Sequence, residues 1–110
     1  MNILFICSRN KWRSLTAETI YKNMPGIKAK SAGTEPSARI KITAKLIDWA
    51  DIIFVMEKKH RQRLADKFPG NIINKRIIVL DIPDEYEYMD EELIKTIKIS
   101  VEPYLNKLAN

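Results

Sequence analysis

Cys7 and Arg13 lie in the segment of this chain that is best suited to chemistry, Cys-Ser-Arg-Asn-Lys-Trp-Arg-Ser. A cysteine between the end of a strand and the start of a helix lies where backbone N–H groups and the helix dipole stabilise negative charge, which favours a thiolate nucleophile. Arg13 adds a planar, charged guanidinium that matches two oxygens of a phosphate. The spacing therefore predicts a nucleophile beside a phosphate-binding arginine.

The neighbouring segments could place these two residues. The apolar run over residues 3–6 predicts a strand that ends just before Cys7. A helix is expected over residues 14 to about 24, ended by Pro25-Gly26. Its apolar positions follow the helical spacing of three, four and seven residues: Ala17, Ile20, Tyr21 and Met24.

The rest of the chain alternates in the same way. Further strands are expected over residues 27–32, 52–56 and 77–80, and the last two are continuous apolar runs of the kind buried on both faces of a parallel sheet. Helices are expected over residues 43–49, between the last two strands, and from the N-cap Asp90 onward. Pro103 should kink or interrupt the last helix near residues 99–100.

Alternation of this kind predicts an α/β fold, in which a four-stranded parallel sheet is flanked by helices in a three-layer domain. The 110 residues, 45% of them hydrophobic, are enough for one such domain over residues 1–110. Because ligands bind beyond the carboxyl ends of such strands, Cys7 and the segment after Leu80 are expected to meet at one site.

The chain has one cysteine and one histidine, which excludes an internal disulfide framework and a Cys/His zinc cluster. We expect no metal and no other cofactor. The first residues carry no charged leader, and no apolar run approaches the length that crosses a bilayer, so a cytoplasmic protein without membrane contact is expected.

The formal charge of +5 indicates an anionic partner. Much of the positive charge falls in residues 58–63, ahead of the apolar Leu64, Ala65 and Phe68, and this pattern is typical of the solvated face of a helix. We place His60 on that face. Because no base-reading or base-stacking motif is present, nucleic acid is disfavoured as the partner.

In these segments the chain resembles the low-molecular-weight protein tyrosine phosphatase family. The family's phosphate loop reads Cys-x-Gly-Asn-x-Cys-Arg-Ser-Pro, and Cys7, Asn10, Arg13 and Ser14 match it in register. Residues 31–34, Ser-Ala-Gly-Thr, resemble the family's second strand and its exit. Residues 50–57 resemble its third strand, which ends in Met-Asp, and Asp84-Glu85-Tyr86 resembles its general-acid loop. The resemblance implies a flavodoxin-like topology.

The resemblance also implies a reaction. Cys7 would attack phosphorus, Arg13 would hold the phosphoryl oxygens, and Asp84 would protonate the leaving phenolate before water hydrolyses the phosphocysteine. Ser14 would stabilise the departing thiolate and Asn10 would brace the loop. The phosphate-binding loop would comprise Cys7, Ser8, Arg9, Asn10, Lys11, Trp12, Arg13 and Ser14.

Two further assignments concern the cavity around this loop. Trp12 and Tyr86 are expected at the substrate rim. Asp81 competes with Asp84 for the role of general acid, although a residue directly at a strand end is more suited to positioning the loop.

Four positions depart from the family pattern: Arg9 for Gly, Trp12 for Cys, Leu15 for Pro and Glu85 for Pro. If the Gly position needs a positive φ, Arg9 would be strained there.

The predicted substrate is a phosphorylated protein or a small aryl phosphate, with inorganic phosphate as the product. A phosphoarginine substrate is less favoured, because Lys11 would repel a guanidinium, and thiol-dependent arsenate reduction would need additional cysteines. A phosphate-binding or protein-interaction module on the same fold is the non-enzymatic alternative. The physiological substrate and the oligomeric state are not predicted.

Overall fold

The computed structural model describes the backbone of residues 1–109 and the side chains of residues 1–106. Four strands form one sheet: β1 (Asn2–Cys7), β2 (Lys28–Gly33), β3 (Ile52–Val55) and β4 (Arg76–Val79). Five helices connect or follow them: α1 (Arg13–Tyr21), α2 (Ala44–Trp49), α3 (Lys58–Lys67), α4 (Pro69–Ile72) and α5 (Glu91–Ala109). The expected alternation of strands and helices is confirmed.

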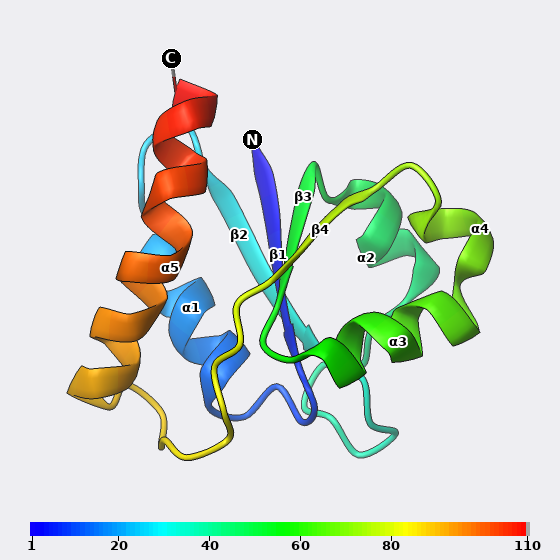
Figure 1. Ribbon diagram of the computed structural model, residues 1–110, viewed down its shortest axis with the longest axis horizontal. Coiled ribbons are helices and arrows are strands. Elements are labelled where there is room, and N and C mark those ends of the chain that lie inside the picture. The colour runs from blue at the N-terminus through cyan, green and yellow to red at the C-terminus, as the bar shows by residue number, and fades with distance from the viewer. Residues whose placement is uncertain (110) are drawn as a thin grey trace.

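The sheet is entirely parallel, with the order β2-β1-β3-β4. Helices α1 and α5 lie on one face, and α2, α3 and α4 lie on the other, which gives the three expected layers (Figure 1). From β1 the chain passes first to β2 on one side and later to β3 on the other. The carboxyl end of β1 is therefore the point at which the strand order reverses, where such sheets bind ligands.

Apolar residues of β1 point alternately to the two faces, and each face has its own core. On the α1/α5 side, the Phe5 ring stacks on Tyr21 and Phe54, with ring centroids 5.8 and 5.5 Å apart. On the other side, Leu4 packs in a buried cluster with Ile47 of α2 and Leu64 of α3. Both faces of β1 are therefore covered, and the strand that ends at Cys7 is buried between the two helical layers.

Three details differ from the expected elements. Helix α1 ends at Tyr21, so Met24 falls in the following turn and is 40% exposed rather than buried. Strand β4 lies at the edge of the sheet and is only half-buried, not buried on both faces. Helix α5 begins after the N-cap Asp90, as expected, but Pro103 lies inside it without interrupting it.

Helices in residues 1–109 do not combine the length and the apolar character needed to cross a bilayer.

Candidate active site

The loop after β1 turns its carbonyl groups toward the segment that follows β2. Thr34 N donates to the Cys7 carbonyl at 3.0 Å, and Glu35 N donates to the Ser8 carbonyl at 2.9 Å. The Arg39 backbone N donates to the Arg9 carbonyl at 3.0 Å. The Arg39 Nε donates to the Asn10 carbonyl at 3.3 Å. The four successive carbonyls of residues 7–10 are thus satisfied by donors from residues 34–39, which fixes the course of the loop.

Gly33, at the end of β2, lets these two segments approach. A Cβ atom built at Gly33 would lie 2.6 Å from the Ser8 carbonyl oxygen and 2.6 Å from the Ala38 Cβ. Distances of this size are steric clashes, so any side chain at this position would push the loop away from β2. The Ser-Ala-Gly-Thr segment seen in the sequence therefore supports the loop directly.

Asn10 carries the left-handed backbone of the loop. Its φ is +54°, whereas φ is not positive at Arg9, so the strain expected for Arg9 is absent. Asparagine tolerates this conformation better than most residues do. The fully buried Asn10 side chain donates from Nδ2 to Ser14 Oγ at 2.8 Å, and its backbone N–H points at Cys7 Sγ, 3.3 Å away.

The Cys7 sulfur receives a second hydrogen-bonding group from Ser14, whose Oγ lies 2.9 Å from Sγ. Because Ser14 Oγ already accepts from Asn10, its own proton is free to be donated to the sulfur. Both groups on the sulfur can thus donate, and donors of this kind stabilise a thiolate. Helix α1 starts beside them, and its N-cap residue Trp12 makes no side-chain capping bond, so the first amides of the helix are left to an anion.

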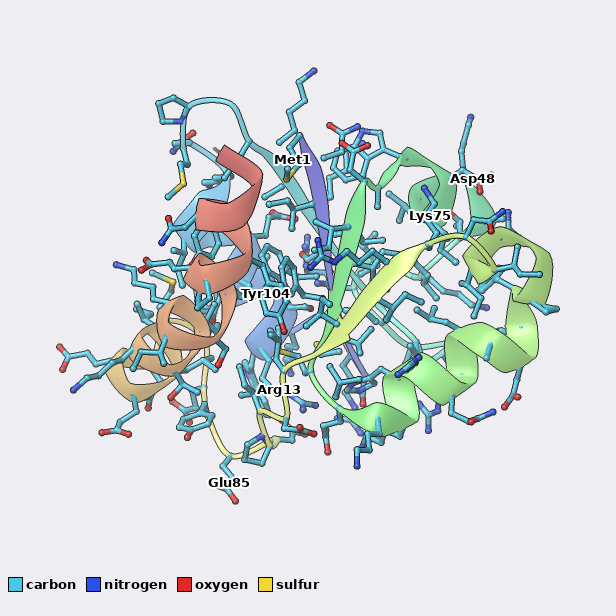
Figure 2. All side chains as sticks on the ribbon, turned by 45° about the horizontal axis from the view of Figure 1, so that its top comes forward. Met1, Arg13, Asp48, Lys75, Glu85 and Tyr104 are labelled. Carbon is cyan, nitrogen blue, oxygen red and sulfur yellow. The ribbon has the colours of Figure 1, made fainter. Side chains whose placement is uncertain are left out.

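Arg13 lies at the first position of α1, and only 2% of its surface is exposed. Its Nη1 donates to Glu57 Oε2 at 2.5 Å and to the Ile82 carbonyl at 2.9 Å, and its Nε lies 3.7 Å from Asp84 Oδ1. In Figure 2, Arg13 lies at the end of the sheet opposite Met1, near the loop that carries Glu85. The expected meeting of the loop after β1 with the segment after β4 is found.

Glu57 and His60 form a second support that sequence reasoning missed. They make a reciprocal capping box at the start of α3, in which the Glu57 backbone N donates to His60 Nδ1 at 3.0 Å. A neutral ring whose Nδ1 accepts carries its proton on Nε2, and Nε2 lies 2.9 Å from Ser8 Oγ. His60 is fully buried, so its expected place on a solvated face was wrong. The Glu-x-x-His spacing resembles a capping box and was the available signal.

The titration of these two residues follows from their surroundings. Burial lowers the pKa of His60 to about 4, and the nearby charge of Arg13 adds to the effect, so the ring is neutral at pH 7. Burial tends to raise the pKa of Glu57, but the hydrogen bond and the charge of Arg13 outweigh it and hold that pKa below its usual value. At pH 7 Arg13 is therefore paired with the Glu57 carboxylate, and Ser8 contacts a neutral His60 ring.

A cavity of about 210 Å³ opens over Cys7. Its lining residues are Cys7, Ser8, Arg9, Lys11, Trp12, Arg13, Glu35, Lys59 and Asp84. The cavity thus brings together most of the predicted loop, including Trp12, and the predicted acid Asp84. Asn10 and Ser14 do not line it and are fully buried. Among the described residues there is no group of His, Cys, Asp and Glu side chains that could hold a metal ion.

Two residues of the segment after β4 lie away from this cavity. Tyr86 is half-buried against the core on the α1/α5 side and does not line this cavity, so its place at the substrate rim stays a prediction. Asp81 has a φ of +56° and lines a separate hollow with Glu57, Lys58, Lys59 and Pro83. Of the two candidate acids, only Asp84 faces the sulfur's cavity.

Neither the protein-family models nor the curated proteins give a match to this sequence. Solved structures do match over nearly the whole chain. The tyrosine phosphatase Wzb from Escherichia coli K30, in complex with phosphate, has a TM-score of 0.78 at 23% identity and covers 97% of each chain. The low-molecular-weight protein tyrosine phosphatase from T. tengcongensis has a TM-score of 0.75 at 21% identity, covering 97% of this chain and 99% of its own.

This chain has the low-molecular-weight protein tyrosine phosphatase fold. A YwlE mutant from Bacillus subtilis is similar as well, with a TM-score of 0.77 at 18% identity over 100% of this chain and 99% of that one. YwlE from Geobacillus stearothermophilus, at 19% identity, is described as an arginine phosphatase. The low-molecular-weight phosphatase fold thus includes neighbours of this chain with two different substrates.

Proposed function

We propose that this protein is a cysteine-dependent phosphatase that hydrolyses phosphotyrosine and other aryl phosphate monoesters through a phosphocysteine. The observation that carries the proposal is the meeting of Cys7, Arg13 and Asp84 at one cavity. Two hydrogen-bonding groups on Sγ and a buried guanidinium are what a thiolate and a phosphoryl group require. Neighbours of the same fold that are described as phosphatases support it.

In the first half of the reaction Cys7 Sγ forms a bond to phosphorus while the bond from phosphorus to the aryl oxygen breaks. Arg13 and the loop amides hold the three equatorial oxygens, and Asp84 gives its proton to the leaving phenolate. In the second half Asp84 takes a proton from water, which attacks phosphorus and releases inorganic phosphate. The proton on Ser14 Oγ stabilises the thiolate that departs.

Lys11 favours an aryl phosphate over phosphoarginine as the substrate. It lines the cavity at Cys7 together with Arg9, Arg13 and Lys59, so four cations outnumber the two carboxylates of that wall, Glu35 and Asp84. A phosphoarginine substrate would bring a guanidinium to this wall, and like charges at short range repel. A phenyl ring carries no such charge and can lie against Trp12, which also lines the cavity.

The test is hydrolysis of p-nitrophenyl phosphate between pH 5 and 8 under reducing conditions, by the native protein and by Cys7→Ser. We expect turnover by the native protein and none above background by the variant, with both folded by circular dichroism. Peptides that carry phosphotyrosine or phosphoarginine then rank the two substrates by kcat/KM. Phosphate binding without turnover by the native protein would contradict the proposal and support the non-enzymatic module.

A further inference from the structure

A second hollow opens beside the cavity at Cys7. It has a volume of about 380 Å³ and is lined by Arg9, Lys11, Ser37 and Arg39. Arg9 and Lys11 also line the cavity at Cys7, so the two hollows share a wall made of two cations. We call the second one the basic hollow. Three of its four lining side chains are positively charged, and the fourth is a small hydroxyl.

The cations of the basic hollow are tied to the phosphate loop. Arg39 donates from its backbone N to the Arg9 carbonyl and from its Nε to the Asn10 carbonyl, at 3.0 and 3.3 Å. The amine of Lys11 lies over the Trp12 ring, 5.5 Å from its centroid. Cations that are held near one place lose less side-chain entropy when an anion binds than free side chains do.

The negative charge nearest to this group is on the other side of the shared wall. Glu35 pairs through Oε2 with Arg9 Nε at 3.3 Å, and it lines the cavity at Cys7 rather than the basic hollow. The Arg9 side chain is 67% exposed, so this pair is a solvent-screened surface interaction. The positive potential at the basic hollow is therefore balanced less than the potential over Cys7.

We propose that the basic hollow is a second anion subsite, which binds the carboxylate of an acidic residue next to the phosphotyrosine of a peptide substrate. This inference rests on the proposed function and specifies its substrate class. Because Arg9 and Lys11 border both hollows, a phosphate over Cys7 and a neighbouring acidic side chain can each meet cations of the same short loop. The net charge of +5 also attracts an acidic peptide at longer range.

Ser37 gives a test that leaves the catalytic groups untouched, because its side chain is exposed and lines the basic hollow but not the cavity at Cys7. We compare Ser37→Glu and Ser37→Lys, with Ser37→Gln as the uncharged control of similar size. The substrates are p-nitrophenyl phosphate, a phosphotyrosine peptide with alanine on both sides, and the same peptide with glutamate on both sides. For the glutamate peptide, Ser37→Glu should lower kcat/KM about two- to fivefold, through KM, and Ser37→Lys should raise it.

The alanine peptide and p-nitrophenyl phosphate should change little, and the preference for glutamate should shrink as salt is added. Equal effects of Ser37→Glu on both peptides, or none on either, would overturn the subsite. A native protein that fails to hydrolyse p-nitrophenyl phosphate would contradict the proposed function instead. Calorimetric binding of the two peptides to Cys7→Ser, with and without Ser37→Glu, then decides the subsite without turnover.

Discussion

Arg13 donates from Nη1 to Glu57 Oε2, and this 2.5 Å contact joins the start of α1 to the N-cap of α3. The Arg13 side chain is 2% exposed, whereas the Glu57 side chain is 31% exposed. A buried cation without its anion is costly, so Glu57 is needed to keep Arg13 in place.

Replacing Glu57 with Gln should therefore lower the free energy of unfolding by about 1–2 kcal/mol, because a charge-assisted hydrogen bond to a buried group becomes a neutral one. Urea denaturation at pH 7 measures the change. Glu35→Gln is the matched control, since its pair with Arg9 is largely exposed and should contribute less than about 1 kcal/mol. Equal losses in the two variants would show that burial of Arg13 does not matter.

Asp84 and Asp81 can be separated by replacing each with Asn. Asp84→Asn should lower kcat for phenyl phosphate by about 10²- to 10⁴-fold, the usual contribution of a general acid. The loss should be smaller for p-nitrophenyl phosphate, whose leaving group needs less protonation. Asp81→Asn should change kcat little, and asparagine tolerates the positive φ found there. A larger loss at Asp81 than at Asp84 would reverse the assignment.

His60 should make the protein less stable in acid. Unfolded histidine has a pKa near 6.5, whereas burial lowers the pKa of folded His60 to about 4. Between these values the unfolded state binds more protons, so stability is full above pH 6.5 and falls as the pH drops toward 4, by about 3 kcal/mol in all.

Urea denaturation of the native protein and of His60→Gln at several pH values between 4 and 7 measures this effect. Glutamine can keep the reciprocal bond of the capping box but does not titrate. The low pKa of Glu57 also removes stability as the pH falls, but both proteins retain Glu57, so their difference isolates His60. Parallel pH profiles for the two proteins would refute the role given to His60.

Tyr21 should be replaceable by Phe with a gain in stability. Its side chain is fully buried, and its hydroxyl has no hydrogen-bond partner among the described residues. Burial raises the pKa of Tyr21 to about 12, with a smaller effect from Glu102, so the hydroxyl stays neutral. Removing an unsatisfied buried hydroxyl while keeping the ring on Phe5 should raise the free energy of unfolding by about 1 kcal/mol. A lower melting temperature for Tyr21→Phe would contradict this.

The sheet was predictable because its central strands are continuous apolar runs between segments of helical period. Residues 3–6 and 52–56 are buried on both faces, and such runs have few alternatives in an α/β chain. The apolar run over residues 77–80 has the same pattern in the sequence as these two strands, yet it forms the half-buried edge strand of the sheet. Strand order depends on long-range packing, which the composition of one segment does not contain.

That Cys7 and Arg13 lie together was predictable from local spacing, but the residues that support them were not. Cys7 and Arg13 belong to one loop, so their relation follows from a short stretch of chain. Glu57 and His60 contact that loop from the start of α3. His60 is buried although its neighbours in sequence are basic, so the sequence pattern predicts a solvated position for it. The positive φ likewise fell on Asn10 rather than on Arg9, because the course of the loop is set by its contacts with residues 34–39.

Gly33 has a consequence for how distant relatives of this chain can be recognised. A Cys-x5-Arg spacing arises easily by chance, whereas a loop that touches β2 as closely as this one also requires a residue without a side chain at the strand exit. The Cys-x5-Arg loop and the glycine at the exit of β2 lie far apart in sequence, but the close packing of the loop on β2 requires both. Asking for both in a sequence search should reject chance matches that either feature alone would admit.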